Sequence, residues 1–371
     1  MSESAAQPTG AIRVALMGTG NCGALALRQL IGDARFDLTG VWVSTEAKVG
    51  RDAGELAGLD VTTGVAATDD LDTIIAAKPD CIVYTAMGDT RPREALADVR
   101  TLLSAGINVV GSSVGALQYP WGLLPDKAIQ KVEDAAREGD STVFFTGVDP
   151  GFCTDLLPFA LAGTCQSIEQ IRTMEIADYA TYDGETVMFD VMGFGRPIST
   201  EIGDLPILYQ PGVLSIAWGT AIRQLAAGLG IEVDEIRDSV EQEPAPEDLN
   251  VAVGTIKKGT VAAVRFLIEG MVGGKPVIVV EHVTRLRADL RPDWAQPAHP
   301  GGSYRVEITG EPSYFCDIVP MSRNGGAPYA AILAAAGRIV NAIPDVVAAE
   351  HGIRTTLDMP LVTGKGLYSA T

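Results

Sequence analysis

Histidine and cysteine, which bind transition metals in many proteins, are scarce in this sequence. It has three histidines and five cysteines among 371 residues, and none stands in a metal-site spacing such as HExxH or CxxC. It also shows no cluster of carboxylates, so we predict no metal site. An odd number of cysteines without paired spacing favours reduced thiols, and with them a cytoplasmic protein.

Positive charge is also scarce. Lysine and arginine number 28 against 47 aspartates and glutamates, for a net charge of −19, and no run is rich in lysine or arginine. Such a chain is a poor ligand for nucleic acid or anionic membranes. We see no uncharged apolar run as long as a membrane span. Residues 1–10 lack the features of a signal peptide, and we interpret them as a disordered leader.

Glycine stands at three positions that together form a dinucleotide fingerprint. The apolar run 14–17 leads into Gly18, Gly20 and Gly23, and an apolar-periodic helix follows. Gly18 permits the tight turn, Gly20 leaves room for the pyrophosphate, and Gly23 allows close packing of helix on strand. The amino-terminal end of that helix then faces the phosphates. The remaining residues of this predicted cofactor turn are Thr19, Asn21 and Cys22.

Short apolar strands alternate with helices as far as residue 148. The predicted strands are Ile12–Met17, Leu38–Val43, Cys81–Thr85, Asn108–Val110 and Thr142–Phe145. This alternation predicts an α/β fold, with a Rossmann-type doubly wound parallel sheet. Ligands of such sheets bind beyond the carboxyl ends of the strands. We therefore assign further cofactor contacts to the strand-end residues Thr85, Ala86, Met87, Ser112, Asp149, Pro150 and Gly151.

The pattern changes after residue 150. Alternating strands without long helices between them predict a second α+β domain with a largely antiparallel open sheet. We expect a dinucleotide-binding domain at 11–150, a substrate and dimerisation domain at 151–325, and a carboxyl-terminal helix and tail at 326–371 that return to the first domain. The acidic, proline-containing stretch 234–250 is predicted to be a solvated excursion.

The end of the second strand bears on the choice of nucleotide. An acidic residue there holds the ribose hydroxyl of NAD, whereas this sequence has Ser44 and Thr45, followed by Lys48 and Arg51. Hydroxyls and cations suit a 2′-phosphate. The pattern favours NADP, and Glu46, which can accept from a ribose hydroxyl, keeps NAD possible.

The segment 146–158 resembles the loop that closes the nucleotide domain in dihydrodipicolinate reductases. It is more similar to the 2,4-diaminopentanoate dehydrogenase family, which includes the native amine dehydrogenases. Further matches are Lys48–Leu56, Tyr119-Pro120-Trp121 and Val340–Pro344. Dihydrodipicolinate reductase activity itself is rejected, because residues 174–184 lack that enzyme's histidine pair.

The resemblance implies two domains, a homodimer, and hydride transfer between a nicotinamide and a C=N or C–N carbon. In the amine-forming members, a glutamate in the loop before Tyr-Pro-Trp handles the protons of ammonia and the iminium. This chain has no carboxylate there, near Gly115. It also has Asp149 where the family often has asparagine.

Candidate catalytic groups are Ser113, Asp178 and Tyr182. Ser113 stands at a strand end, where it either contacts the substrate or caps a turn. Glu175 and Asp178 are three apart on a strand and point to opposite faces, and the resemblance favours Asp178 with Tyr182. The alternative for Asp178 is a backbone hydrogen bond at the strand end. His282 alternates within a strand and is interpreted as a packed residue.

We therefore expect an NAD(P)H-dependent oxidoreductase that transfers hydride to a C=O or C=N carbon of a small, mostly apolar substrate. It is amine dehydrogenase-like but lacks the family's glutamate. The alternative is a nucleotide-binding sensor of the same fold that has lost catalysis.

Overall fold

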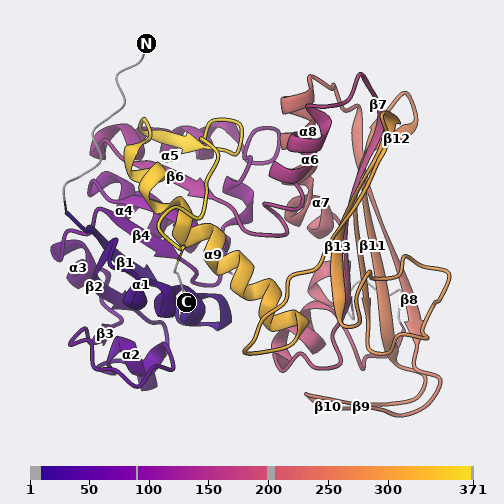
Figure 1. The fold of residues 1–371 in the computed structure, drawn as a ribbon, viewed down its shortest axis with the longest axis horizontal. Coiled ribbons are helices and arrows are strands. Elements are labelled where there is room, and N and C mark those ends of the chain that lie inside the picture. The colour runs from indigo at the N-terminus through magenta and orange to yellow at the C-terminus, as the bar shows by residue number, and fades with distance from the viewer. Residues whose placement is uncertain (1–9, 89–90, 199–204, 369–371) are drawn as a thin grey trace. The chain divides into compact units, whose positions relative to one another are not determined.

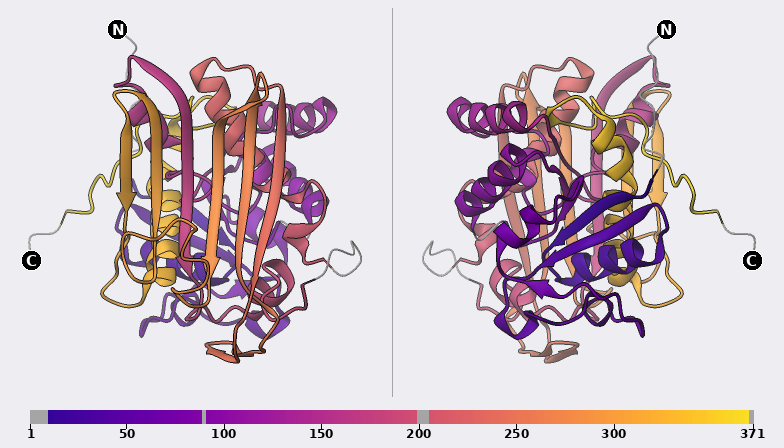
Figure 2. Two further views of the ribbon diagram at one scale, coloured as in Figure 1. Left: turned by 90° about the vertical axis from the view of Figure 1, so that its right-hand side faces the viewer. Right: turned by 90° about the vertical axis from the view of Figure 1, so that its left-hand side faces the viewer.

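The computed structural model describes residues 10–88, 91–198 and 205–368, so all but the last residue of the predicted leader lies outside it. The chain divides into two compact units. Unit 1 comprises Met1–Val148 with Ile332–Thr371, and unit 2 comprises Asp149–Ala331. Figures 1 and 2 show the arrangement of elements within each unit.

Unit 1 is built on a parallel sheet. Within the described residues it has seven strands in the order β15-β6-β5-β4-β1-β2-β3. Their bounds are β1 Ile12–Met17, β2 Phe36–Trp42, β3 Ala67–Thr68, β4 Cys81–Tyr84, β5 Asn108–Gly111, β6 Thr142–Phe145 and β15 Gly352–Arg354. All side chains of β4 and β6 are buried, as expected for strands covered on both faces. The predicted Rossmann-type class is confirmed.

Helices cover this sheet (Figure 1). They are α1 Asn21–Gly32, α2 Ala53–Leu56, α3 Leu71–Ala76, α4 Pro92–Ser104, α5 Asp126–Gly139 and the unit 1 part of α9 Ala327–Ala348. Pro92 opens α4, where its missing N–H costs nothing. From α9, the Asn341 side chain accepts a hydrogen bond from Gln29 of α1 at 3.2 Å. This contact ties the end of the chain to the first helix of unit 1.

By length and composition alone, α9 meets the criterion for a membrane span, at 22 residues with few charges. The core helix of a globular domain passes the same test. Ile339, Val340 and Ile343 of α9 are completely buried within the protein, as the side chains of a core helix are.

Unit 2 is built on a mixed, mostly antiparallel sheet. Among the described residues it has six strands in the order β14-β13-β7-β12-β11-β8, visible in the left view of Figure 2. The bounds are β7 Ser167–Asp178, β8 Glu235–Pro244, β11 Val261–Val272, β12 Lys275–Arg285, β13 Gly302–Glu311 and β14 Tyr314–Ile318; β9 Leu249–Val251 and β10 Gly254–Ile256 form a separate hairpin. The predicted open sheet is confirmed, with one parallel pair, β7 with β12.

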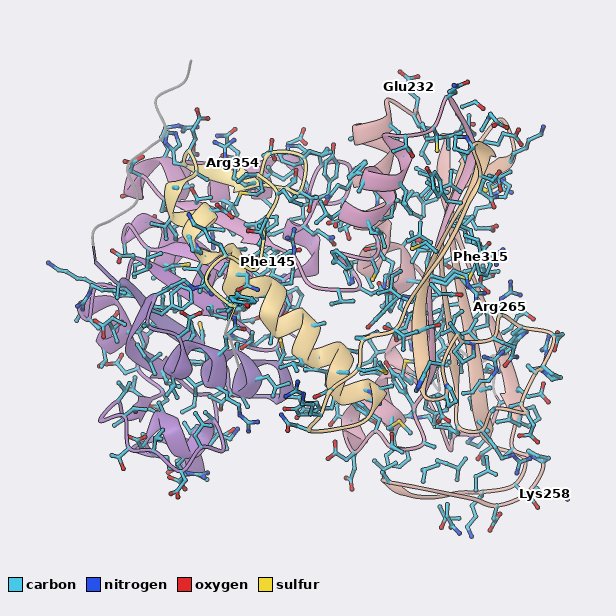
Figure 3. All side chains as sticks on the ribbon, in the orientation of Figure 1. Phe145, Glu232, Lys258, Arg265, Phe315 and Arg354 are labelled. Atoms are coloured by element: carbon cyan, nitrogen blue, oxygen red, sulfur yellow. The ribbon has the colours of Figure 1, made fainter. Side chains whose placement is uncertain are left out.

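The two faces of this sheet differ. Val264, Phe266 and Ile268 of β11 are completely buried in the apolar core, to which α8 Gly219–Leu229 and the shorter α6 Leu156–Ala162 and α7 Val213–Ala217 also contribute. Because successive strand residues point to opposite faces, Arg265 projects from the other face (Figure 3). There it pairs with Glu281 at 2.7 Å and with Glu241 at 2.8 Å.

One expectation about unit 2 needs correction. The stretch 234–250 is not an excursion, because β8 within it pairs antiparallel with β11 along its length. Ile236 and Val240 pack against the core while acidic neighbours face water, an arrangement that an edge strand tolerates. The apolar residues around Gly193 belong to the core, since Met188 and Phe194 are completely buried; a π-helix spans Thr186–Val191.

Candidate active site

The glycine turn in unit 1 joins β1 to α1. Gly18 has φ +98°, and a Cβ atom there would lie 2.5 Å from the backbone nitrogen of Ala86. A Cβ on Gly23 would lie 1.9 Å from the Gly18 carbonyl oxygen. Both positions therefore require glycine for packing within the protein. Around Gly20, in contrast, no atom lies within 4 Å of such a Cβ, so this glycine faces open space.

The loops after β1, β4 and β5 meet at this turn. The Thr85 hydroxyl donates to the Gly18 carbonyl at 2.7 Å, and the Ser113 hydroxyl donates to the Ala86 carbonyl. Met87 beside them is 52 % exposed. The predicted cofactor loops of unit 1 therefore converge, and the Ser113 hydroxyl serves a loop carbonyl there.

Cys22, at the start of α1, is a free, half-buried cysteine. Burial raises its pKa to about 11, against the opposing effect of a hydrogen bond with Ser112. The thiol therefore stays protonated at neutral pH. All five cysteines lie among the described residues, and they form no disulfide.

Lys48 and Arg51 follow the exposed strand-end residues Ser44 and Thr45. The Lys48 ammonium donates to both the carbonyl and the hydroxyl oxygen of Thr19, each at 3.0 Å. It thereby places a positive charge directly against the glycine turn. The Arg51 guanidinium pairs with Glu55 at 2.8 Å and remains 40 % exposed, which leaves part of it available to an anion.

These features of unit 1 fit a dinucleotide. Gly20 offers a cradle that any side chain would fill, and α1 begins there without a side-chain cap on its first N–H groups. Free N–H groups and the positive end of the helix dipole bind phosphate. The residues that would hold the pyrophosphate are thus Gly18, Thr19, Gly20 and Asn21, with Lys48 alongside.

Unit 2 contains a buried charged cluster, which we call the carboxylate–histidine cluster: Asp149, Glu175 and His282. One carboxylate oxygen of Asp149 accepts a hydrogen bond from the Trp218 indole N–H at 3.0 Å. The other lies 3.1 Å from His282 Nε2, and the two side chains are 2 % and 6 % exposed. The Trp218 ring leans over the imidazole, with ring centres 4.4 Å apart.

Glu175 lies on the opposite side of the imidazole. Its carboxylate is 3.9 Å from His282 Nδ1, and it accepts a hydrogen bond from the Tyr179 hydroxyl at 3.3 Å. The pairing of β7 with β12 aligns Glu175 with His282 across the sheet. The imidazole therefore lies between two carboxylates, with one facing each ring nitrogen.

Burial and charge act in opposite directions on this cluster. Burial raises the pKa of Glu175, and the neighbouring Asp149 carboxylate adds to this rise against the opposing effect of His282. Burial disfavours the charged imidazole, but the two carboxylates outweigh it, so the pKa of His282 is raised. Both groups consequently hold protons more tightly than they do in water, as expected of proton-transfer groups.

The same three side chains offer ligand atoms within 4.8 Å of one another, close enough for a metal ion. The carboxylates of Asp149 and Glu175 each lie nearest a different nitrogen of the imidazole, at 3.1 and 3.9 Å. Such an arrangement can also pass a proton along the ring.

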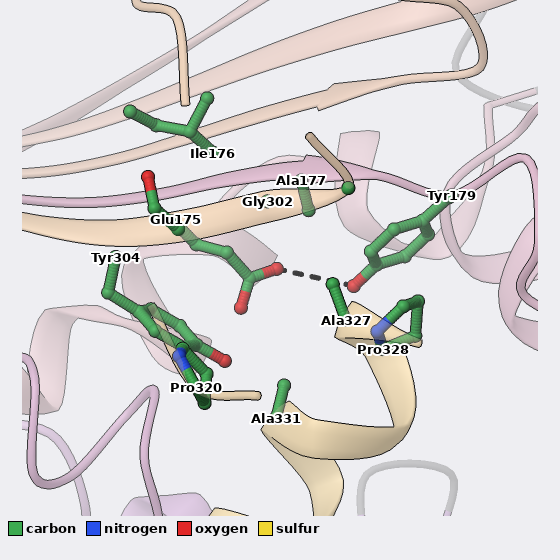
Figure 4. Close-up of a pocket in the computed structure, with 12 residues that line it drawn as sticks. Glu175, Ile176, Ala177, Tyr179, Gly302, Tyr304, Pro320, Ala327, Pro328 and Ala331 are labelled. Atoms are coloured by element: carbon green, nitrogen blue, oxygen red, sulfur yellow. Dashed lines mark hydrogen bonds between the residues drawn. The ribbon is translucent and has the colours of Figure 1, made fainter. Parts of the chain in front are cut away.

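A pocket of about 40 Å³ opens beside Glu175 (Figure 4). The Glu175 carboxylate and the Tyr179 hydroxyl meet in it, and the Tyr304 ring lies nearby. The remaining walls are small or apolar: Ile176, Ala177, Gly301, Gly302, Ser303, Pro320, Ala327, Pro328 and Ala331. The pocket therefore has one polar end inside an otherwise apolar wall.

The other predicted residues of unit 2 lie around the cluster. The Asp178 carboxylate accepts a hydrogen bond from the Ala180 N–H at 2.8 Å, which is the backbone role left open for it. Tyr182 stacks on Tyr179 with ring centres 5.2 Å apart. Asp149 is followed by Pro150 and Gly151, whose N–H donates to the Thr154 hydroxyl at 2.8 Å.

Three members of the site were not singled out from the sequence. His282 was assigned to packing, and Trp218 and Tyr304 carried no motif. Glu175 was weighed, but only against Asp178. The missing information was the parallel pairing of β7 with β12, which sets Glu175 beside His282.

Comparison with known proteins agrees with this architecture. Residues 152–366 match the model of the 2,4-diaminopentanoate dehydrogenase C-terminal domain. An amine dehydrogenase of Streptomyces virginiae is 39 % identical over 352 residues, covering 94 % of this chain and 96 % of that protein. The 2,4-diaminopentanoate dehydrogenase of Acetoanaerobium sticklandii is 25 % identical and covers 94 % of each chain.

The solved structure of an amine dehydrogenase from Mycobacterium smegmatis has the same fold. The TM-score is 0.76 at 23 % identity, over 96 % of this chain and 98 % of that one. With the nucleotide-binding turn of unit 1, these findings place the chain in a known group. It belongs to the 2,4-diaminopentanoate dehydrogenase and amine dehydrogenase family and is an NAD(P)-dependent oxidoreductase.

Proposed function

We propose that this protein is an NADP(H)-preferring amine dehydrogenase in which Glu175 moves the protons. The net reaction joins a ketone, ammonia, NADPH and a proton to give a primary amine, NADP⁺ and water. The observation that carries the proposal is the buried Glu175 carboxyl beside His282, with its raised pKa. The 39 % identical amine dehydrogenase supports the reaction class.

When bound to unit 1, the cofactor supplies the hydride that reduces the carbon. Lys48 holds a positive charge against the glycine turn, and Arg51 is partly exposed after the second strand. Both groups favour a cofactor with an additional phosphate. Glu55 would compete with the 2′-phosphate for the Arg51 guanidinium. NADPH binding therefore requires that the Arg51–Glu55 ion pair loosens or that Arg51 donates to both anions.

Glu175 has two tasks in this reaction. As a carboxylate it removes a proton from ammonium, which frees the nitrogen lone pair to form the C–N bond as the C=O double bond opens. As a carboxylic acid it then protonates the hydroxyl of the resulting carbinolamine, which leaves as water. Burial and the neighbouring Asp149 carboxylate raise the pKa of Glu175, so its acid form is more favoured than that of a glutamate in water.

His282 and Asp149 position the Glu175 carboxyl group that takes up and releases this proton. The imidazolium faces Glu175 through Nδ1 and is held from the other side by Asp149. The positive charge of His282 therefore limits how far the pKa of Glu175 rises. The Trp218 ring packs against the imidazole. In this account Glu175 takes over the task of the glutamate that the family carries before its Tyr-Pro-Trp element, where this chain has no carboxylate near Gly115.

Substitution of Glu175 by glutamine tests the proposal. NADPH oxidation is followed with a panel of apolar ketones, with and without ammonium. We expect Glu175→Gln to lose about 10²-fold or more in kcat, the contribution of a positioned acid–base group, while the Kd for NADPH stays unchanged. Glu169→Gln, an exposed position on the same strand, is the matched control.

The outcomes separate the proposed function from two alternatives. Tight NADPH binding by the wild-type chain without ammonium-dependent turnover would refute the proposal and support the sensor alternative. Turnover without ammonium would refute it in favour of a plain carbonyl reductase.

A further inference from the structure

A pocket between α4 and α5 of unit 1 plays no part in the reaction proposed for Glu175. Its volume is about 350 Å³, and every residue that lines it comes from these two helices or from Pro125, directly before α5. The lining includes none of the residues of the glycine turn and none of the strand-end residues assigned to the cofactor. We propose that this pocket binds an organic phosphate with at least two phosphate groups, separately from the dinucleotide.

The two helices place cations around the same space. Helix α4 packs beside α5 (Figure 1), and a Cβ on Gly139, at the end of α5, would lie 1.9 Å from a backbone carbonyl oxygen of α4. The carboxyl ends of the helices are therefore in close contact, and the pocket lies between their amino-terminal halves. Arg93 and Arg100 line it from α4, two turns apart. Lys127 and Lys131 line it from α5, one turn apart, so each pair shares one face of its helix.

These four side chains, which we call the pocket cations, lack the carboxylate partners that neighbouring cations have. Arg91, directly before α4, pairs with Asp98. Arg137, further along α5, pairs with Asp134 at 2.8 Å. Within the described part of the chain, none of the pocket cations forms an ion pair, and no acidic residue lines the pocket. A multiply charged anion between the helices would supply the missing partners through charge-assisted hydrogen bonds.

Size and composition indicate which anion fits. The volume of about 350 Å³ is in the range of small-molecule sites, about 300–1,000 Å³, and greatly exceeds what one inorganic ion needs. Leu96, Pro125 and Ala128 form apolar wall between the cations, which suits a carbon skeleton. Arginine binds phosphate through two parallel hydrogen bonds, and lysine binds it as a point charge. Two of each therefore favour a ligand with two phosphate groups on an organic body.

The overall charge favours a small ligand over a polyanionic surface. The chain carries a net charge of −19, which repels a nucleic acid or an anionic membrane that approaches it. At ordinary salt concentration, charges beyond roughly 10 Å are screened. A small molecule enclosed by the pocket cations therefore interacts mainly with them, whereas an extended polyanion also meets the acidic surroundings.

Titration calorimetry with fructose 1,6-bisphosphate as the probe tests the proposal on the full chain without turnover. We expect saturable binding of one molecule per chain, tighter than that of inorganic phosphate. Arg100→Gln and Lys131→Gln each remove one charged donor, from α4 and α5 respectively, and should raise the Kd about tenfold or more. Arg137→Gln is the matched control, because it removes an exposed cation of α5 that already has a partner, and it should leave the Kd unchanged.

Lys48→Gln distinguishes this pocket from the cofactor turn, where Lys48 contacts Thr19. We expect this variant to bind the probe as the wild type does. Probe binding that is lost in Lys48→Gln and kept in Arg100→Gln would place the phosphates at the cofactor turn and refute the proposal. Absence of saturable probe binding would refute it as well, as would equally tight binding of citrate or of inorganic phosphate. Binding to phosphatidylglycerol vesicles, but not to the probe, would show a membrane surface instead.

Discussion

The stability of unit 2 should depend on pH through the contact between Asp149 and His282, and Asp149→Asn tests this. The two side chains are almost completely buried, with Oδ2 and Nε2 3.1 Å apart. Asparagine keeps the shape of the side chain and an oxygen acceptor for the Trp218 indole. The substitution therefore removes little besides the negative charge facing the imidazole.

The direction of the pH effect follows from the raised pKa of His282. The folded protein holds this proton more tightly than the unfolded chain, whose histidine titrates near 6.5. The stabilisation is therefore fully present below about pH 6.5 and is lost as the pH rises through the higher pKa of the folded state. Asp149→Asn removes the main cause of the rise, so the difference in stability between wild type and variant should be largest below about pH 6.5 and should shrink as the pH rises.

The magnitude at pH 6 is about 1–3 kcal/mol, the cost of leaving a buried polar or charged group without its partner. It lies below the full cost of an uncompensated buried charge because His282 can release its proton. For a unit of this size, 1 kcal/mol corresponds to about 2–4 °C in melting temperature. We thus expect Tm to fall by about 2–12 °C at pH 6 and by less at pH 9.

Differential scanning calorimetry of both proteins across this pH range is the assay. Asp183→Asn, at an exposed position in the same unit, is the control and should leave the melting curve unchanged. An equal loss of stability at pH 6 and pH 9 would refute the ion pair, because a merely structural effect of asparagine would not follow the titration of His282.

Three further substitutions test other parts of the account. Arg51→Ala should raise the KM for NADPH far more than that for NADH; equal changes would remove the assignment of a 2′-phosphate to this residue. Gly23→Ala places a Cβ 1.9 Å from a carbonyl oxygen and should lower the free energy of unfolding by about 1–3 kcal/mol. It should also weaken dinucleotide binding, measured by calorimetric titration. Gly32→Ala, where a Cβ would meet open space, is the control and should be neutral or slightly stabilising. Glu281→Gln leaves two arginines facing a neutral group at a position 1 % exposed. We expect the free energy of unfolding, measured with urea, to fall by about 1–3 kcal/mol; the loss is not larger because both arginines still reach solvent. An unchanged free energy of unfolding would contradict a stabilising role for these ion pairs.

The nucleotide-binding unit was predictable because its information is local. Gly18, Gly20 and Gly23 fix a backbone turn, and strands buried on both faces appear as unbroken apolar runs, so β1 and β6 have the predicted bounds. Edge strands gave no such signal. The two-residue β3 and the short β15 are defined by pairing with a neighbour, which a sequence pattern does not contain.

The second unit was less predictable because its site depends on pairing between distant segments. Alternation correctly predicted Ser167–Asp178 as a strand, and it separates Glu175 from Asp178. Which of the two meets a partner depends on the register of β7 against β12, whose residues are over a hundred positions apart. The charged sequence of β8 was misleading for a similar reason, since Glu241 of β8 meets Arg265 of β11 only in the folded sheet.

The most direct test of the account is the fate of isotopically labelled nitrogen. The wild-type enzyme is incubated with an apolar ketone, NADPH and ¹⁵N-labelled ammonium, and the product is examined by mass spectrometry. We expect the label in a primary amine, in amounts equal to the NADPH consumed, with at least a 10²-fold lower rate for Glu175→Gln. NADPH consumption that yields only unlabelled alcohol, or labelled amine formed equally well by Glu175→Gln, would contradict it.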